Sequence, residues 1–174
     1  MSYSYQEDEV VLTADNLLTY KNKIWFTERD CNELYCLDLE QGYPKMVCKF
    51  DAEKEYQSRL FGGLIPLKEK LYAIPCAAER MYEIDTSAGE VKGIALKKPQ
   101  PGGYLQYMER MKFLSGHAFN DCIYLVPTTY PAIVEYDSAT GEICYYDGWI
   151  KEIAKECDKG FFRKSCMAGE KIYM

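Results

Sequence analysis

Lys70-Leu-Tyr-Ala-Ile74, followed by Ile84-Asp-Thr-Ser-Ala-Gly89, is the stretch that decides the fold. The same arrangement occurs three times: an aromatic anchor, an aspartate thirteen residues later and a glycine four residues after the aspartate. The three triplets are Trp25, Asp38 and Gly42; Tyr72, Asp85 and Gly89; and Tyr124, Asp137 and Gly141. A fourth anchor is Tyr173. The anchors lie 47, 52 and 49 residues apart, which indicates an internal repeat.

Each period contains the signals of four short strands. Leu64-Ile-Pro-Leu67 and Leu71-Tyr-Ala-Ile74 flank a Lys-Glu-Lys turn, which predicts a hairpin. Residues 80–85 alternate in polarity, and residues 91–96 supply a fourth strand. The repeated aspartate can accept backbone N–H bonds in the next turn, where the glycine supplies a positive φ. Four antiparallel strands in about fifty residues predict an all-β fold, a β-propeller of four-stranded antiparallel blades.

The repeat predicts a single domain over residues 1–174, with about three and a half blades per chain. We place the blades at residues 14–50, 60–97 and 112–147, with a partial blade at 161–174. The connection over residues 147–160 carries an apolar stripe at helical spacing. Because Asp147 can cap its start and Gly160 can end it, we predict a helix in this connection.

The repeated units resemble those of known propeller families. Leu34-Tyr-Cys-Leu-Asp38 and Ile133-Val-Glu-Tyr-Asp-Ser-Ala-Thr-Gly141 are similar to the blades of kelch-type and quinoprotein-type propellers. The resemblance covers about residues 14 to 174. It implies the architecture of the blades, and it implies no catalytic residues for this chain.

A propeller has to close, because an open ring exposes strand edges and the apolar faces between blades. Two chains could form a homodimer around a two-fold axis and complete a ring of about seven blades. Alternatively, residues 3–13 could return as an outer strand and close a four-bladed monomer. The third alternative is that the chain is part of a longer protein. We expect the homodimer, because it completes both half blades without further sequence.

The charge and the cysteines exclude several classes of protein. A net charge of −6 argues against a nucleic-acid binder, because neutralising phosphates requires clustered cations. No apolar stretch is long enough to span a membrane, and the amino terminus has no secretory signal. We therefore predict a cytoplasmic protein whose eight cysteines are reduced. Their spacing shows no zinc-ligand pattern, and we expect no metal site.

The chain carries no motif of a known catalytic chemistry. A Gly-rich phosphate loop, a serine nucleophile elbow and a dinucleotide fingerprint are missing, so we expect no cofactor. The single histidine, His117, lies seven residues before the anchor Tyr124. Leu18, Ile65 and Cys166 hold the same place before the other anchors. We interpret His117 as the replacement of a core residue and keep ligand binding as the alternative.

The five arginines follow a pattern that the lysines do not share. In the blade arrangement they all fall on connections at one rim: Arg29, Arg59, Arg80, Arg110 and Arg163. Lysines also crowd the opposite rim, and arginine alone offers a planar fork for carboxylate or phosphate. We therefore hypothesise a ligand-binding face at the arginine-bearing rim. The alternative is local ion pairing with the glutamates that directly precede three of them, namely Glu28, Glu79 and Glu109.

These observations favour a non-enzymatic interaction module that binds an anionic small molecule or an acidic partner protein through its loops. Three tyrosines near the same rim could stack on a sugar or peptide side chain, or pack between blades: Tyr104, Tyr107 and Tyr130. Two alternatives stay open, a lyase or hydrolase with a site in the central channel and an inactive partial propeller. Convergence of His117 with a carboxylate and a tyrosine in one cleft would favour the enzyme.

Overall fold

Four consecutive antiparallel sheets follow one another along the chain, and we number them blades 1 to 4. The computed structural model describes residues 12–99, 111–153 and 160–174. Blade 1 contains β1 (Ala14–Tyr20), β2 (Lys23–Glu28), β3 (Glu33–Asp38) and β4 (Pro44–Lys49). Blade 2 contains β5 (Phe61–Leu67), β6 (Lys70–Pro75), β7 (Arg80–Asp85) and β8 (Val91–Ala95). Blade 3 contains β9 (Phe113–Phe119), β10 (Cys122–Pro127), β11 (Ile133–Asp137) and β12 (Ile143–Tyr146), and blade 4 the hairpin β13 (Cys166–Ala168) and β14 (Lys171–Tyr173).

Within each blade the strands are paired in the order in which the chain runs. The hairpin predicted on either side of the Lys-Glu-Lys turn is the pair β5 and β6, with Leu67 opposite Lys70. Three four-stranded antiparallel sheets and one two-stranded sheet make a partial β-propeller, as the spacing predicts.

The third and fourth strands of blades 1 to 3 are joined by the predicted aspartate–glycine turns. In blade 2 the Asp85 Oδ1 atom accepts the backbone N–H of Ser87 (2.8 Å) and of Ala88 (3.0 Å). The Gly89 N–H donates to the Asp85 carbonyl (2.9 Å) at a φ of +70°. The Ser87 hydroxyl and these N–H groups lower the pKa of Asp85 to about 2. The same turn recurs at Asp38 with Gly42 and at Asp137 with Gly141.

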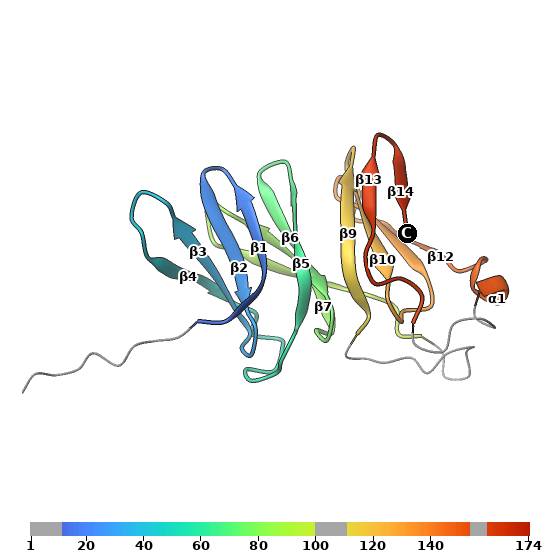
Figure 1. Cartoon of the computed structure of the whole chain (residues 1–174), viewed down its shortest axis with the longest axis horizontal. Helices are drawn as coiled ribbons and strands as arrows, with labels where there is room; N and C mark the ends of the chain where they lie inside the picture. Colours follow the sequence, from blue (N-terminus) through green and yellow to red (C-terminus); the bar gives the residue numbers. More distant parts are fainter. Residues whose placement is uncertain (1–11, 100–110, 154–159) are drawn as a thin grey trace, which may run out of the picture.

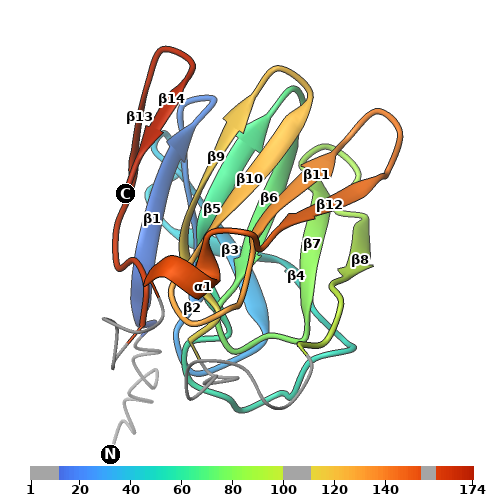
Figure 2. The same ribbon diagram turned by 90° about the vertical axis from the view of Figure 1, so that its right-hand side faces the viewer.

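The blades all run in the same direction, which gives the molecule two unlike rims (Figures 1 and 2). At the hairpin rim, tight turns join the first strand of each blade to the second. At the loop rim lie the connections from second to third strands and the longer connections between blades. The first strands β1, β5 and β9 are neighbours across the molecule, and β13 follows beside β9 (Figure 1). They form the inner side of the arc.

A belt of backbone hydrogen bonds links the blades along the loop rim. The Arg59 N–H donates to the Arg29 carbonyl (2.7 Å), and the Ala77 N–H donates to the Arg59 carbonyl (3.1 Å). The belt continues with N–H bonds from Lys112 to Cys76 (3.0 Å), from Thr128 to Lys112 (2.8 Å) and from Phe161 to Thr128 (2.6 Å). Each bond joins a loop after a second strand to a segment that leads into the same blade or the next one, so the loops of this rim are held together.

Apolar clusters fill the spaces between the blades. The anchor Trp25 is 4% exposed in the cluster between blades 1 and 2, and the anchor Tyr72 is 2% exposed in the cluster between blades 2 and 3. Each of these anchors is covered by the following blade. Tyr124 of blade 3 is half-buried, and Tyr173 of blade 4 is 54% exposed. Burial of the anchor therefore depends on the presence of the next blade.

The connection after β12 contains one helical turn, α1 (Ile150–Ile153). It begins three residues after Asp147, whose carbonyl accepts the N–H of Ile150 (3.1 Å). The helix predicted over residues 147–160 thus begins at Ile150 and not directly after Asp147. Residues 154–159 lie outside the described residues. None of the described helices is long and apolar enough to cross a membrane. No disulfide links the described cysteines.

Two glycines allow the inner strands to approach one another. A side chain at Gly62 of β5 would overlap the Phe113 carbonyl oxygen and would lie 2.9 Å from Leu114 Cα, both in β9. A side chain at Gly116 of β9 would lie 2.9 Å from the Ile65 Cδ1 atom. These distances are shorter than the contacts of ordinary Cβ atoms. The packing of blade 2 on blade 3 therefore requires glycine at position 62, where the added atom meets backbone, and the repeat pattern does not show this.

Gly62→Ala should destabilise the protein by about 2 kcal/mol, because the added methyl group forces β5 away from β9. Gly63→Ala is the matched control, since a methyl group there meets only the Ile74 Cδ1 atom at 3.5 Å. Urea unfolding followed by circular dichroism gives the free energy of unfolding of both variants. Equal stability of the two would contradict the close approach of these strands.

Candidate functional site

Three of the five arginines lie at the loop rim of blades 1 and 2. Arg29 follows β2 and Arg59 leads into β5, and the bond from the Arg59 N–H to the Arg29 carbonyl joins their backbones (2.7 Å). Arg80 begins β7, and its side chain lies over Gly93, where an added methyl group would come within 3.0 Å of the Arg80 Cδ atom. Arg29 and Arg59 therefore lie on adjoining connections and Arg80 lies at the start of β7, and we refer to the three as the arginine cluster.

The other predicted residues of this rim lie apart from the arginine cluster. Arg163 is exposed on the segment that leads into β13. Three residues fall outside the described part of the chain: Arg110, Tyr104 and Tyr107. Tyr130 is buried, and its ring packs against that of Phe113 with 4.8 Å between centroids. This ring is covered by protein, as in the alternative in which the rim tyrosines pack between blades.

A buried carboxylate supports the loops that carry the arginine cluster. Glu53, from the connection between β4 and β5, accepts the backbone N–H of Glu79 (2.9 Å) and of Arg80 (3.2 Å). It also accepts the hydroxyl of Tyr82 (2.8 Å). Burial and the bond to Glu53 raise the pKa of Tyr82, so this hydroxyl stays a donor at neutral pH. Glu53 thereby fastens blade 1 to the β6–β7 loop, a role that no local sequence pattern marks.

Glu28, which directly precedes Arg29, is also buried and also bonds to the backbone. Its carboxylate accepts the N–H of Thr13 (3.3 Å) and of Asp30 (2.6 Å). Within residues 12–99, 111–153 and 160–174, neither Arg80 nor Arg163 takes part in an ion pair. Local pairing with a preceding glutamate therefore does not account for Arg80.

The lysines of the hairpin rim take part in ion pairs that link neighbouring turns or strands. Lys21 pairs with Glu69 in the next turn, and Lys68 pairs in the same way with Asp121 (2.7 Å). Two further pairs lie within blades, between Lys70 and Glu83 (2.5 Å) and between Lys23 and Asp38 (3.7 Å). These lysines of the hairpin rim thus take part in contacts between and within blades.

His117 lies where the repeat places it. It is paired with Tyr124, just as Leu18 is paired with Trp25 and Ile65 with Tyr72. Its Nε2 atom lies 2.8 Å from the Ser165 Oγ atom, ahead of β13. Burial lowers the pKa of His117 below its ordinary value, so the ring is neutral at pH 7. His117 therefore links blade 3 to blade 4 at a position where blades 1 and 2 have apolar residues.

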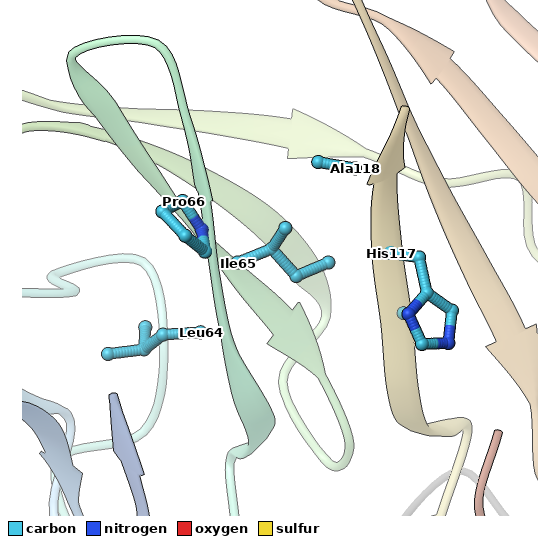
Figure 3. A pocket seen from close by; sticks show the side chains of 6 residues that line it. Leu64, Ile65, Pro66, His117 and Ala118 are labelled. Carbon is cyan, nitrogen blue, oxygen red and sulfur yellow. The ribbon is translucent and has the colours of Figure 1, made fainter. Parts of the chain in front are cut away.

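A shallow hollow of about 290 Å³ lies between β5 and β9 on the inner side of the arc. It is lined by Leu64, Ile65, Pro66, Gly116, His117 and Ala118. Figure 3 shows Ile65 and Ala118 between the two strands, while the ring of His117 is directed away from them, on the far side of β9. Apart from His117, the side chains that line the hollow cannot ionise, so it offers no charged group to a substrate.

His117 does lie near a tyrosine and a carboxylate. Tyr124 is directly opposite His117 in the sheet, and Glu135 is opposite Tyr124. Burial raises the pKa of Tyr124 to about 12. The same tyrosine–glutamate pairing occurs in blade 2, where the Tyr72 hydroxyl donates to Glu83 (2.9 Å) beneath blade 3. The pairing is therefore a repeated feature of blade packing, and it lies outside the hollow.

No group of three or more metal-ligating side chains comes together in the described part of the chain. No protein-family model matches the sequence, and no curated protein matches it. The solved structures that the chain resembles share its architecture. A streptogramin B lyase is 18% identical with a TM-score of 0.56, covering 76% of this chain and 39% of the lyase chain.

A nidogen/laminin complex gives 8% identity and a TM-score of 0.53, over 75% of this chain and 46% of the other. A computationally designed protein gives 10% identity and a TM-score of 0.59, over 91% of this chain and 41% of the other. This chain thus spans less than half the length of each of these three. At such identities the similarity shows the β-propeller fold and no activity.

Glu53→Gln should destabilise the protein by about 2 kcal/mol, because an amide cannot accept from all three donors and turns its own N–H groups toward one of them. Glu55→Gln is the matched control, since Glu55 is exposed and its distance to Lys49, 4.0 Å, is at the limit of an ion pair. Thermal and urea unfolding of both variants measure the difference. A Glu53→Gln protein as stable as the control would contradict the supporting role of Glu53.

Proposed function

We propose that this chain is a non-catalytic β-propeller module that binds a carboxylate-bearing ligand at the arginine cluster. The observations that carry the proposal are the backbone bond that brings Arg59 beside Arg29 and the Glu53 carboxylate that holds the Arg80 backbone at the same rim. A guanidinium group offers two parallel N–H donors that match a carboxylate. The ligand is a small polycarboxylate or an acidic segment of a partner protein, which share this chemistry.

The rigidity of the loops supports this proposal. The bond between Arg59 and Arg29 and the Glu53 bonds to Glu79 and Arg80 fix the backbones before any ligand arrives. A preorganised site loses less conformational entropy on binding. The net charge of −6 repels anions at long range, but salt screens such repulsion beyond about 8 Å, so close contacts decide the affinity.

We also propose, as the sequence leads us to expect, that the blades are of the kelch-like or quinoprotein-like type and that the protein is cytoplasmic. Solved structures of similar architecture include a lyase and a protein complex, so the fold is compatible with either role. The arginine cluster supports the binding role, because guanidinium groups stay protonated at neutral pH and recognise carboxylates.

Titration of the ¹⁵N-labelled chain with citrate and with a hexaglutamate peptide tests the proposal by NMR. We expect amide shifts in the loops around Arg29, Arg59 and Arg80, and weaker binding as salt is raised. The double variant Arg59→Gln/Arg80→Gln should lose at least tenfold in affinity, about 1.4 kcal/mol.

The matched control is Lys45→Gln/Lys92→Gln, which removes the same charge from exposed strand positions. It should bind as the unmodified chain does. Equal weakening of both double variants would show that general charge attraction accounts for the binding, and would overturn the proposal. The absence of amide shifts at millimolar ligand would overturn it as well. Shifts with the peptide but not with citrate would identify an acidic protein segment as the ligand.

A hydrolase is the second candidate, because the His117 Nε2 atom lies within proton-transfer distance of the Ser165 hydroxyl (2.8 Å). That hydroxyl also bonds to the Ser115 hydroxyl (2.8 Å), as expected of a contact between blades. We expect a fluorophosphonate probe to leave Ser165 unlabelled in mass spectrometry. Labelling that disappears in His117→Ala would favour the hydrolase, and a chain that neither binds nor reacts would be the inactive partial propeller.

A further inference from the structure

A second hollow, of about 350 Å³, lies between blades 2 and 3 at the hairpin rim. Five of its lining residues come from blade 2, and the sixth comes from the turn after β11 in blade 3: Leu67, Lys68, Glu69, Lys70, Tyr72 and Ser138. The turns that carry them lie side by side, because Lys68 pairs with Asp121 (2.7 Å) and the Ser138 N–H donates to the Asp121 carbonyl (2.8 Å) (Figure 2). The hollow has the size of a small-molecule site, and we refer to it as the rim hollow.

The repeat explains why there is room at this place. Leu67 ends β5 as Tyr20 ends β1, and Tyr72 holds the anchor place that Trp25 holds in blade 1. Between blades 1 and 2 the larger pair occupies the corresponding space, and the Tyr20 hydroxyl reaches across to donate to the Lys68 carbonyl. A leucine and a tyrosine take up less volume than a tyrosine and a tryptophan. The rim hollow is therefore a specific feature of the join between blades 2 and 3.

Buried hydrogen bonds hold the inner end of the rim hollow in place. The Tyr72 hydroxyl donates to Glu83 (2.9 Å), and the other oxygen of Glu83 accepts from the Lys70 ammonium group (2.5 Å). Tyr72 is 2% exposed and Glu83 is 8% exposed. Burial and the bond to Glu83 raise the pKa of Tyr72, so its hydroxyl stays protonated at neutral pH. Because the members of this network are bonded to one another, the hollow keeps its shape without a ligand.

The charged groups around the rim hollow balance one another. Three ion pairs contribute equal numbers of positive and negative charges: Lys68 with Asp121, Lys70 with Glu83, and Lys21 with Glu69. An ammonium group carries three N–H donors, so Lys68 and Lys70 can each donate to a ligand as well as to the paired carboxylate. Glu69, whose side chain is 81% exposed, and the Ser138 hydroxyl can accept. The rim hollow thus offers donors beside acceptors.

We propose that the rim hollow binds a neutral polyhydroxyl compound of the size of a monosaccharide. Neighbouring hydroxyl groups donate and accept at once, which matches ammonium donors placed beside carboxylate and hydroxyl acceptors. An anion would be repelled by Asp85, near Lys70, and by Asp137, near Lys68. A cation would be repelled by the two ammonium groups. Leu67 offers an apolar wall to the C–H face of a sugar ring, and the site lies at the rim opposite the arginine cluster and is independent of it.

Titration of the ¹⁵N-labelled chain with glucose, galactose and myo-inositol tests the proposal by NMR. We expect saturable shifts of the Lys68, Glu69 and Ser138 amides with at least one of these compounds, at a dissociation constant in the millimolar range. Because the ligand is neutral, this binding should change little as salt is raised. Inorganic phosphate and ethylenediamine serve as charged comparison probes, and neither should give saturable shifts at these amides.

Leu67→Tyr fills the rim hollow with the side chain that blade 1 carries at the same place, and should weaken binding at least tenfold. Leu39→Tyr is the matched control, because Leu39 is 51% exposed in the turn between β3 and β4, in blade 1. It should bind as the unmodified chain does. Ser138→Ala keeps the backbone bond to Asp121 but removes one hydroxyl, and should weaken binding by about threefold.

Three results would overturn the proposal. The first is the absence of shifts from all three polyols at high millimolar concentration. The second is saturable binding of phosphate or ethylenediamine without binding of a polyol, which would identify a site for a charged ligand. The third is a Leu67→Tyr protein that binds as tightly as the Leu39→Tyr control. Where circular dichroism shows that Leu67→Tyr does not fold, Ser138→Ala decides in the same way.

Discussion

Each blade of this protein depends on the next one for the burial of its aromatic anchor. Trp25 and Tyr72 lie within the apolar clusters between successive blades, and a single sheet could not bury them alone. Between blades 2 and 3, Gly62 lets the inner strands β5 and β9 come together. The directions of the strands then place all hairpin turns at one rim and all long connections at the other. Because the buried anchors fix the order of the blades, the connections that carry the candidate site lie together at the loop rim.

The two rims are held together by different interactions. The hairpin rim uses exposed ion pairs between side chains, such as Lys68 with Asp121, which contribute little stability in water. The loop rim uses backbone bonds. Their N–H donors on the segments that lead into blades 2, 3 and 4 belong to three different residue types, Arg59, Lys112 and Phe161. Because a backbone bond does not depend on the side chain, residues of the loop rim can differ from blade to blade without loss of the belt. A rim of this kind is suited to carry a binding function.

Features that depend on neighbours along the chain were predictable from the sequence, and features that depend on other blades were not. The turns at Asp38, Asp85 and Asp137 are local, and the structure confirms them. The period alone relates His117 to Ile65, which the pairing of each with its anchor confirms. Glu53 acts on a loop 26 residues further on, and Gly62 is needed because of a strand in another blade. Only the packed blades show why these residue types are required.

Blade 2 has a complete four-stranded neighbour on both sides, which holds for no other blade in the described part of the chain. In an array whose units contact only their neighbours, local opening begins at the ends and reaches the middle last. The amide hydrogens of β6, with partners on both flanks, would therefore exchange with solvent most slowly, and those of the β13–β14 hairpin fastest. Such a molecule unfolds in steps that begin at its outer blades. The cooperativity of its unfolding therefore depends on how many blades are packed between two neighbouring blades.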